Sequence, residues 1–163
     1  MKTLNLVDID KSDIKYQIQR FPDGQQNIVI DNNKGVLSKK LYLDKEQYSF
    51  EIPIESVQIK SRLNNWLDLE LVVCAVAALR ELGVEEIHLY VPYIMGSRSD
   101  RKFEEGGNNY LKDVICPIIN SLNFKTVTCM DPHSDVLEAC IKGFRKESNL
   151  DLVKFSLLNI YEK

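Results

Sequence analysis

Residues 66–83, WLDLELVVCAVAALRELG, are apolar on most sides and end in glycine. A surface helix carries one apolar stripe, so apolar residues on most faces predict a helix that is buried between other elements. Asn65 is a candidate N-cap and Gly83 a candidate C′ residue. The sequence therefore predicts a largely buried helix at roughly 66–82, and the rest of the fold must cover it.

Strands and helices alternate around this segment. The first helix is followed by a strand that Pro92 helps to end. After that strand, apolar residues recur at the i, i+3, i+4 spacing of one helical stripe. The predicted elements are a strand at 86–93, a helix at about 108–122, a strand at 124–130 and a short helix from Ser134 or Asp135 through Ile141. This order predicts an α/β domain with a mainly parallel central sheet, right-handed crossovers and helices on both faces. Residues 144–163 show no pattern that assigns them.

Before residue 61 the pattern is the period-two alternation of β-strands. A turn-rich cluster at 31–35 (DNNKG) separates two groups of alternating residues. The alternating apolar residues are Leu4, Leu6, Ile28, Ile30, Phe50, Ile52, Ile54, Val57 and Ile59. We expect an N-terminal antiparallel β ribbon from this part of the chain.

Composition excludes several classes of protein. The 163 residues suit one domain, and 44% hydrophobic with 28% charged residues indicates a globular chain rather than a disordered one. A net charge of −3 gives no general attraction to nucleic acid or to an acidic membrane. There is no apolar run for a signal peptide or a bilayer span, so we expect a cytoplasmic protein. We interpret the four cysteines, none in a C-x-x-C pair, as core residues in a reducing compartment: Cys74, Cys116, Cys129 and Cys140.

Two segments leave carboxyl ends of predicted strands, where open parallel sheets bind ligands. The first, 96–102, carries Arg98, Arg101 and Lys102, which suit phosphate oxygens. A solvated basic loop is the alternative interpretation. Gly106-Gly107 nearby gives the backbone freedom to approach a ligand, although such a pair can equally mark a turn.

The second segment, 131–135, places Asp131 and His133 two residues apart at a helix start. Together they can bind a divalent cation, and Mg²⁺ also takes phosphate oxygens from its nucleotide. In the alternative interpretation, Asp131 and Ser134 are turn and capping residues and His133 is a bystander. The other histidine, His88, lies in a strand pattern and is expected to be structural. An anion clamp beside a metal-capable pair suits phosphoryl-type chemistry, which is mostly positioning and electrostatic stabilisation.

Four segments, in this order, resemble ribose-phosphate pyrophosphokinases, the PRPP synthetases. RFPDGQ (20–25) is similar to that family's F-x-[ND]-G-E loop, and residues 59–93 to the strand, helix and strand that follow it. SRSDRK (97–102) resembles A-R-Q-D-R-K, and MDPHSD (130–135) resembles M-D-L-H-A-D. The likeness spans about residues 20–142.

The resemblance implies roles that the residues alone do not give. It implies transfer of the pyrophosphoryl group of Mg-ATP to ribose 5-phosphate, giving phosphoribosyl pyrophosphate and AMP, with Arg98 and His133 catalytic. It implies Mg²⁺ at Asp131 and His133. The loop around Phe21 would grip adenine in a neighbouring subunit's site, which implies a homo-oligomer, typically a hexamer. The implied ATP-binding residues are Phe21, Asp23, Gln25, Arg98, Ser99, Asp100, Arg101, Lys102 and His133.

The chain also departs from that family's pattern. Gln25 replaces Glu, Ser99 replaces Gln, and Pro132 replaces Leu, the last as in divergent, phage-like members. Nothing matches the glycine-rich loop of the family's second domain, which binds the ribose phosphate. We therefore expect residues 1–163 to be the N-terminal ATP-binding domain alone, incomplete as an isolated chain. The alternatives are a non-catalytic regulatory or assembly subunit, which retention of His133 and the basic residues disfavours, and ADP-ribose as a larger acceptor.

Overall fold

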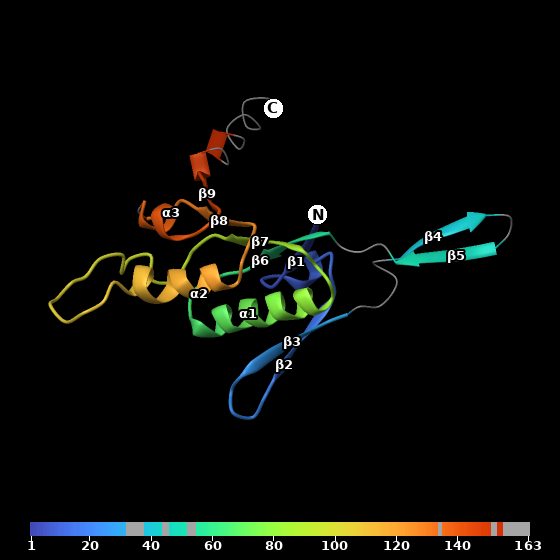
Figure 1. Ribbon diagram of the computed structural model, residues 1–163, viewed down its shortest axis with the longest axis horizontal. Coiled ribbons are helices and arrows are strands. Elements are labelled where there is room, and N and C mark those ends of the chain that lie inside the picture. Colours follow the sequence, from blue (N-terminus) through green and yellow to red (C-terminus); the bar gives the residue numbers. More distant parts are fainter. Residues whose placement is uncertain (32–37, 44–45, 52–54, 134, 151–152, 155–163) are drawn as a thin grey trace.

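The computed structural model describes residues 1–31, 38–43, 46–51, 55–133, 135–150 and 153–154. At its centre is a five-stranded sheet in which all neighbouring strands run parallel (Figure 1). In spatial order its strands are β1 (Lys2–Asn5), β6 (Ser56–Lys60), β7 (Glu86–Val91), β8 (Thr126–Met130) and β9 (Phe144–Glu147). The predicted α/β class with a mainly parallel sheet is confirmed.

Two antiparallel hairpins stand apart from this sheet, as β2 (Tyr16–Arg20) with β3 (Gln26–Ile30), and β4 (Ser38–Leu43) with β5 (Glu46–Glu51). They confirm the predicted N-terminal ribbon. Two of the alternating segments expected in this antiparallel ribbon, β1 and β6, instead pair parallel with each other in the central sheet. Period-two alternation reports a half-buried strand and carries no information on the direction of its neighbour. Residues 52–54 lie outside the described residues.

The helix predicted at 66–82 is α1 (Trp66–Glu81). The Asn65 side chain accepts a hydrogen bond from the Asp68 amide at 3.1 Å, and the Asp68 carboxylate accepts one from the Asn64 amide at 2.8 Å. Gly83 ends the helix with φ of +81°. The helix packs against the sheet on one side and against β3 on another, which explains its many apolar faces.

The second predicted helix is a π-helical turn, η2 (Leu111–Ile115), that continues into α2 (Cys116–Ser121). The short helix is α3 (Val136–Cys140), and Asp135 precedes it without a side-chain capping bond. Ser134 lies outside the described residues. A further short 3-10 helix, η1 (Ile9–Lys11), follows β1. None of the helices in the described part of the chain is long and apolar enough to cross a lipid bilayer.

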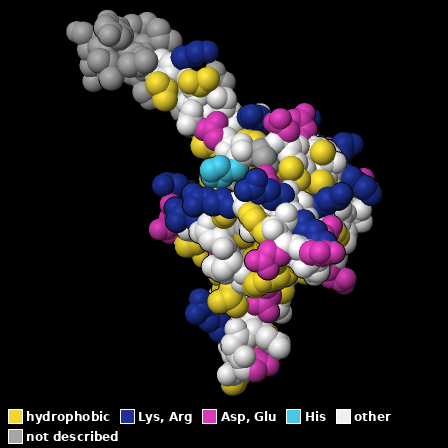
Figure 2. Space-filling model, turned by 90° about the vertical axis from the view of Figure 1, so that its left-hand side faces the viewer, with side chains coloured by type: hydrophobic (Ala, Val, Ile, Leu, Met, Phe, Trp, Pro, Cys, Tyr) yellow, Lys and Arg dark blue, Asp and Glu magenta, His cyan; other side chains and the backbone are white. Residues whose placement is uncertain are grey.

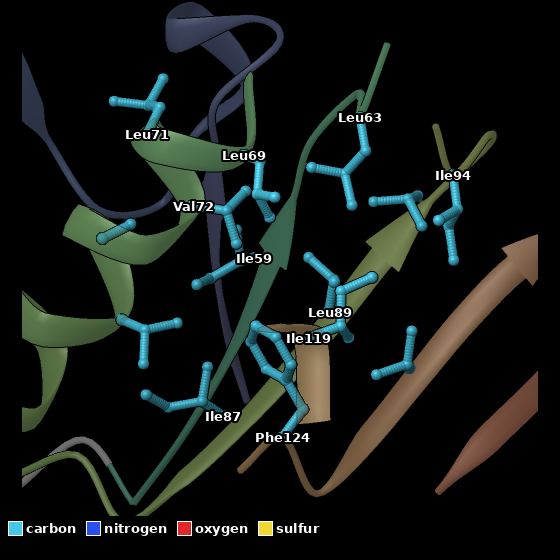
Figure 3. Close-up of a cluster of buried hydrophobic side chains, with 14 of the residues drawn as sticks. Ile59, Leu63, Leu69, Leu71, Val72, Ile87, Leu89, Ile94, Ile119 and Phe124 are labelled. Atoms are coloured by element: carbon cyan, nitrogen blue, oxygen red, sulfur yellow. The ribbon is translucent and has the colours of Figure 1, made fainter. Parts of the chain in front are cut away.

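The helices α1, α2 and α3 gather on one face of the sheet (Figure 1). Strands β6 to β9 follow one another in space as in sequence, so right-handed crossovers place every connecting helix on the same side. Figure 3 shows Leu69 and Val72 of α1 beside Ile59 of β6, and Ile119 of α2 near Leu89. The expected helices on both faces are therefore not found among the described residues, where one face is covered.

The opposite face of the sheet is polar. Lys60 pairs with Tyr90 in register, and Tyr90 with Thr128. The Lys60 Nζ lies 5.8 Å from the centroid of the Tyr90 ring, and His88 Nδ1 lies 2.7 Å from Thr126 Oγ1. Parallel strands that are covered on both faces read as continuous apolar runs, whereas these strands alternate. The alternation of apolar and polar residues along these strands is therefore typical of a sheet that is covered on one face.

Candidate functional site

Two loops leave the carboxyl ends of adjacent strands. Strands β7 and β8 are neighbours, and Val91, the last residue of β7, pairs with Cys129. The chain then leaves the sheet as residues 92–110 after β7 and as residues 131–135 after β8. Neighbouring strands lie about 4.8 Å apart, so the two loops start side by side at one edge. The expectation that they leave neighbouring strands is confirmed.

The loop after β7 folds back on itself through its own backbone. The Ser97 amide donates to the Ile94 carbonyl at 3.2 Å, and the buried Ser97 hydroxyl also donates to it. The Ser99 amide donates to the Gly96 carbonyl at 2.7 Å, and the Ser99 carbonyl accepts from the Leu111 amide at 3.1 Å. The polypeptide that carries the predicted anion-binding residues is therefore held through Ser97 and Ser99.

This loop presents its cations to solvent. Arg98, Arg101 and Lys102 are exposed, while Ser99 and Asp100 are half-buried. The ion pairs in the described part of the chain are Lys11 with Asp8 and Lys125 with Glu86, so none of the three loop cations forms an ion pair with a described carboxylate. The loop also carries Asp100, Glu104 and Glu105, so its cations attract an anion locally and not through a net positive charge. Figure 2 looks onto this end of the molecule and shows lysine and arginine side chains gathered near a histidine.

One of these cations rests on an aromatic ring. The guanidinium carbon of Arg101 lies 5.3 Å from the centroid of the Phe103 ring, and Phe103 is 62% exposed. A guanidinium over an aromatic face is attracted by the ring's quadrupole. Stacking occupies the plane of the guanidinium and leaves the donors along its edge free for oxygen ligands.

The loop after β8 begins with Asp131, whose φ of +41° is unusual for a residue other than glycine. Its amide donates to the Glu147 carbonyl at 2.8 Å, and its two carboxylate oxygens lie 3.2 and 3.3 Å from the Asn149 amide. His133 is exposed two residues later. An ionised carboxylate has about four acceptor positions, so the bond to Asn149 leaves room for a cation.

Among the described residues no three His, Cys, Asp or Glu side chains are arranged to hold a metal ion. Asp131 and His133 would supply two ligands at most. That set fits Mg²⁺, which is commonly held by one or two carboxylates with the remaining positions filled by water and phosphate oxygens. The residues are thus compatible with a magnesium ion that arrives with its nucleotide.

The three predicted adenine contacts lie elsewhere. Phe21, Asp23 and Gln25 form the turn of the β2–β3 hairpin, which extends beyond α1 on the side away from the sheet (Figure 1). The Phe21 amide donates to the Gln25 carbonyl at 2.8 Å, and Gly24 takes φ of +90°. The Phe21 ring is 47% exposed. Within one chain, the turn is not part of the edge that Arg98 and His133 share.

The cysteines are all free thiols, as expected. Burial raises the pKa of Cys116 to about 12, and the neighbouring Cys140 adds to this effect. Burial likewise raises the pKa of Cys129 to about 11, with a smaller contribution from the Asp131 charge. Thiols held in their neutral form are poor nucleophiles and poor metal ligands. Cys116 and Cys129 are buried, whereas Cys74 and Cys140 are half-buried, so the interpretation as core residues holds for two of the four.

Sequence reasoning missed Asn109, Tyr110 and Phe103, which shape the loop after β7. Asn109 precedes a helix and stands four residues before Asp113, whose carboxylate accepts from the Asn109 amide at 2.8 Å. Asparagine is a favoured N-cap residue, so a helix-start rule would have found Asn109. Tyr110 carries no such signal, because its ring contacts Gly96 across the loop. Phe103 contacts Arg101 two residues away, and no periodic pattern marks that contact.

No protein-family model matches the sequence, and no curated protein matches it. Among solved structures, the fold is similar to that of a phosphoribosylpyrophosphate synthetase from Mycobacterium smegmatis, with a TM-score of 0.66 at 11% sequence identity. The match covers 94% of this chain and 46% of that one. At this identity the likeness establishes architecture: the chain shares the fold of about half of a phosphoribosylpyrophosphate synthetase.

Proposed function

We propose that this chain binds Mg-ATP at the carboxyl edge of its sheet, as the nucleotide-binding half of a ribose-phosphate pyrophosphokinase. One observation carries the proposal: the loop with the unpaired cations Arg98, Arg101 and Lys102 and the Asp131–His133 loop leave adjacent parallel strands at the same edge. The similarity in fold to a phosphoribosylpyrophosphate synthetase supports it. So does the order of the four sequence segments that resemble that family.

In this proposal different side chains bind different parts of Mg-ATP. Arg98, Arg101 and Lys102 bind the triphosphate oxygens, and His133 donates a further hydrogen bond to them. Ser99 and Asp100 complete the loop at its half-buried centre. Mg²⁺ bound by Asp131, with His133 beside it, would neutralise phosphate charge.

The reaction is a transfer between two oxygens. The C1 hydroxyl oxygen of ribose 5-phosphate forms a bond to the β-phosphorus of ATP, and the bond from that phosphorus to the α–β bridging oxygen breaks. AMP leaves with the bond's electrons, and the hydroxyl proton is released to solvent. Arg98 and His133 stabilise the oxygens on which negative charge grows, which is the main contribution of a protein to such transfers. The ribose 5-phosphate site would lie mostly on a domain outside these residues.

The adenine site would be completed by a second copy of the chain. The Phe21 turn is remote from the sheet edge within one chain. Apolar side chains on the hairpin and at the start of α1 are exposed: Ile18 43%, Phe21 47%, Val29 44%, Trp66 50% and Leu67 55%. Ile18 and Val29 lie on opposite faces of the hairpin, so both of its faces offer apolar contacts to a partner. A homo-oligomer in which Phe21, Asp23 and Gln25 reach a neighbour's nucleotide accounts for both observations.

The same exposed side chains favour a second candidate, a non-catalytic subunit that assembles with catalytic partners through the β2–β3 hairpin. This candidate does not require Arg98 or His133. ADP-ribose, which bears the same ribose phosphate, is the alternative acceptor. The catalytic candidate requires Mg-ATP binding through Arg98 and His133, whereas the assembly candidate does not.

Titration calorimetry of the full chain with Mg-ATP tests the proposal, beside Arg98→Ala and His133→Ala. Lys142→Ala is the matched control, because this exposed cation precedes β9 at the opposite edge of the sheet. We expect both site variants to weaken binding and the control to leave it unchanged. In the longest natural form of the protein, we expect each site variant to lower ribose 5-phosphate-dependent AMP release about a hundredfold.

Wild-type rates in either site variant would refute the assigned roles. Absence of activity in the longest natural form would favour the assembly subunit. Absence of binding in the wild-type chain, with assembly intact, would refute the nucleotide site.

A further inference from the structure

The side chain of Asn109 joins two parts of the chain that sequence reasoning treats separately. Its Oδ1 accepts a hydrogen bond from the Lys112 amide at 2.9 Å, which caps the helix formed by η2 and α2. Its Nδ2 donates to the Asp100 carbonyl at 2.6 Å, nine residues earlier in the basic loop. One amide group therefore spans the helix start and the centre of the loop.

The backbone of Asn109 is fixed as well. Its amide donates to the Asp113 carboxylate at 2.8 Å, and its carbonyl accepts from the Asp113 amide at 2.7 Å. The residue is half-buried. With both of its backbone groups bonded within the helix, Asn109 cannot follow the loop if the loop moves, so it acts as a fixed point for Asp100.

Asparagine suits this position because the two bonds need opposite groups. The helix cap needs an acceptor and the Asp100 carbonyl needs a donor, and a side-chain amide carries both. An aspartate would cap the helix but has no proton to donate when ionised. A serine also caps helices well, but it has one short hydroxyl that cannot reach both partners.

The tether acts next to the cations. Asp100 precedes Arg101 and Lys102, and the neighbouring Ser99 carbonyl is already bonded to the Leu111 amide. Two consecutive carbonyls of the loop are thus anchored to the first residues of one helix. An exposed loop that is ordered before its ligand arrives loses less conformational entropy on binding.

We infer that Asn109 is the positioning residue of the basic loop: it holds the Asp100 backbone so that Arg101 and Lys102 meet a triphosphate in a preset arrangement. The functional half of this inference rests on the proposed nucleotide site. The structural half, that Asn109 orders the loop, stands without it.

Asn109→Ser tests the inference, since it keeps a neutral helix cap and removes the donor to Asp100. Asn108→Ser, at the exposed residue next to it, is the matched control. We expect Asn109→Ser to unfold near the wild-type temperature and to exchange the amide protons of residues 97–102 faster. We expect its dissociation constant for Mg-ATP to rise about fivefold, the scale of one lost hydrogen bond. Asn109→Asp should accelerate exchange in the same residues.

The outcomes separate the two claims. Wild-type exchange in the loop of Asn109→Ser would overturn the structural half, whether or not the chain binds nucleotide. Faster exchange with unchanged Mg-ATP affinity would overturn positioning while leaving the proposed nucleotide site in place. If the wild-type chain itself fails to bind Mg-ATP, the nucleotide proposal falls, together with the part of this inference that depends on it.

Discussion

The ring of Tyr110 lies against the α-carbon of Gly96. A Cβ atom on Gly96 would come within 2.9 Å of Tyr110 Cδ1 and within 3.5 Å of Ile115 Cγ1. Gly96 also has φ of +83°, a conformation that side chains rarely adopt. The loop after β7 can follow its path to the helix only because residue 96 has no side chain.

Gly96→Ala should therefore destabilise the chain for two separate reasons. The positive φ costs about 1–2 kcal/mol for any L-residue, and displacing Tyr110 adds about 1–3 kcal/mol of overpacking. Gly106→Ala is the control, because Gly106 has φ of +81° and nothing within 4 Å of its Cβ position. Urea unfolding of both variants measures the difference, and equal losses of stability would show that the Tyr110 contact contributes nothing.

Phe103 should matter for nucleotide affinity through Arg101. A cation–π contact at an exposed site is worth about 0.5–1 kcal/mol, so Phe103→Leu should raise the dissociation constant for Mg-ATP about two- to fivefold. Phe103→Tyr keeps the ring and should bind like the wild type. Calorimetry distinguishes them, and identical affinities for the Leu and Tyr variants would rule out the ring's contribution.

Stability should fall in alkaline solution because of the buried thiols. The pKa values of Cys116 and Cys129 are raised from 9.0 to about 12 and about 11 in the folded chain. Above pH 9 the unfolded chain loses these protons and the folded chain keeps them, so the stabilisation present below pH 9 is lost as pH rises toward the folded pKa.

We expect the free energy of unfolding to fall by at least about 1 kcal/mol between about pH 8 and about pH 10.5, after allowance for solvent screening. Urea titrations at the two pH values measure it. Cys116→Ala should show a shallower pH dependence than the wild type. A slope as steep as that of the wild type in both Cys116→Ala and Cys129→Ala would assign the effect to other groups.

The exposed Phe21 ring at the hairpin turn should contribute to self-association. Burying an aromatic side chain contributes about 1.5–3 kcal/mol, so Phe21→Ser should weaken assembly by at least about tenfold in the dissociation constant. Val7→Ser is the control, at a residue 49% exposed on another part of the surface. Sedimentation velocity over a range of concentrations makes the measurement. A wild-type chain that stays monomeric throughout would contradict the prediction.

The sequence predicts the sheet and its helices well because burial decides them. The stretch around Val72 has to be covered on several sides, and the segments around Leu89 and Val127 are too short and too apolar to stand alone. The direction of β1 and β6 was not predictable, because alternation is the same in parallel and antiparallel strands. Placing helices on both faces ignored the polar residues Lys60 and Tyr90, whose alternation indicates one covered face.

The candidate site was predicted in part. The motifs identified Arg98 and His133, and strand order then brought their loops to one edge. The helix cap of Asn109 is a local signal that a helix-start rule would detect, but its bond to Asp100 joins residues nine positions apart. The contact of Tyr110 with Gly96 joins residues fourteen positions apart. Long-range contacts of single side chains have no periodic signature in a sequence.

A sheet with one apolar and one polar face cannot tolerate a shift in the register of its strands. A shift of β6 by one residue would place the Lys60 ammonium beneath α1 and expose Ile59 to solvent. A shift of β7 by one residue would likewise place Tyr90 on the face that packs against the helices. Every strand thus enforces the alignment of the next. The loops after β7 and β8 begin where these strands end, so the packing of the core sets the spacing between the two loops of the candidate site.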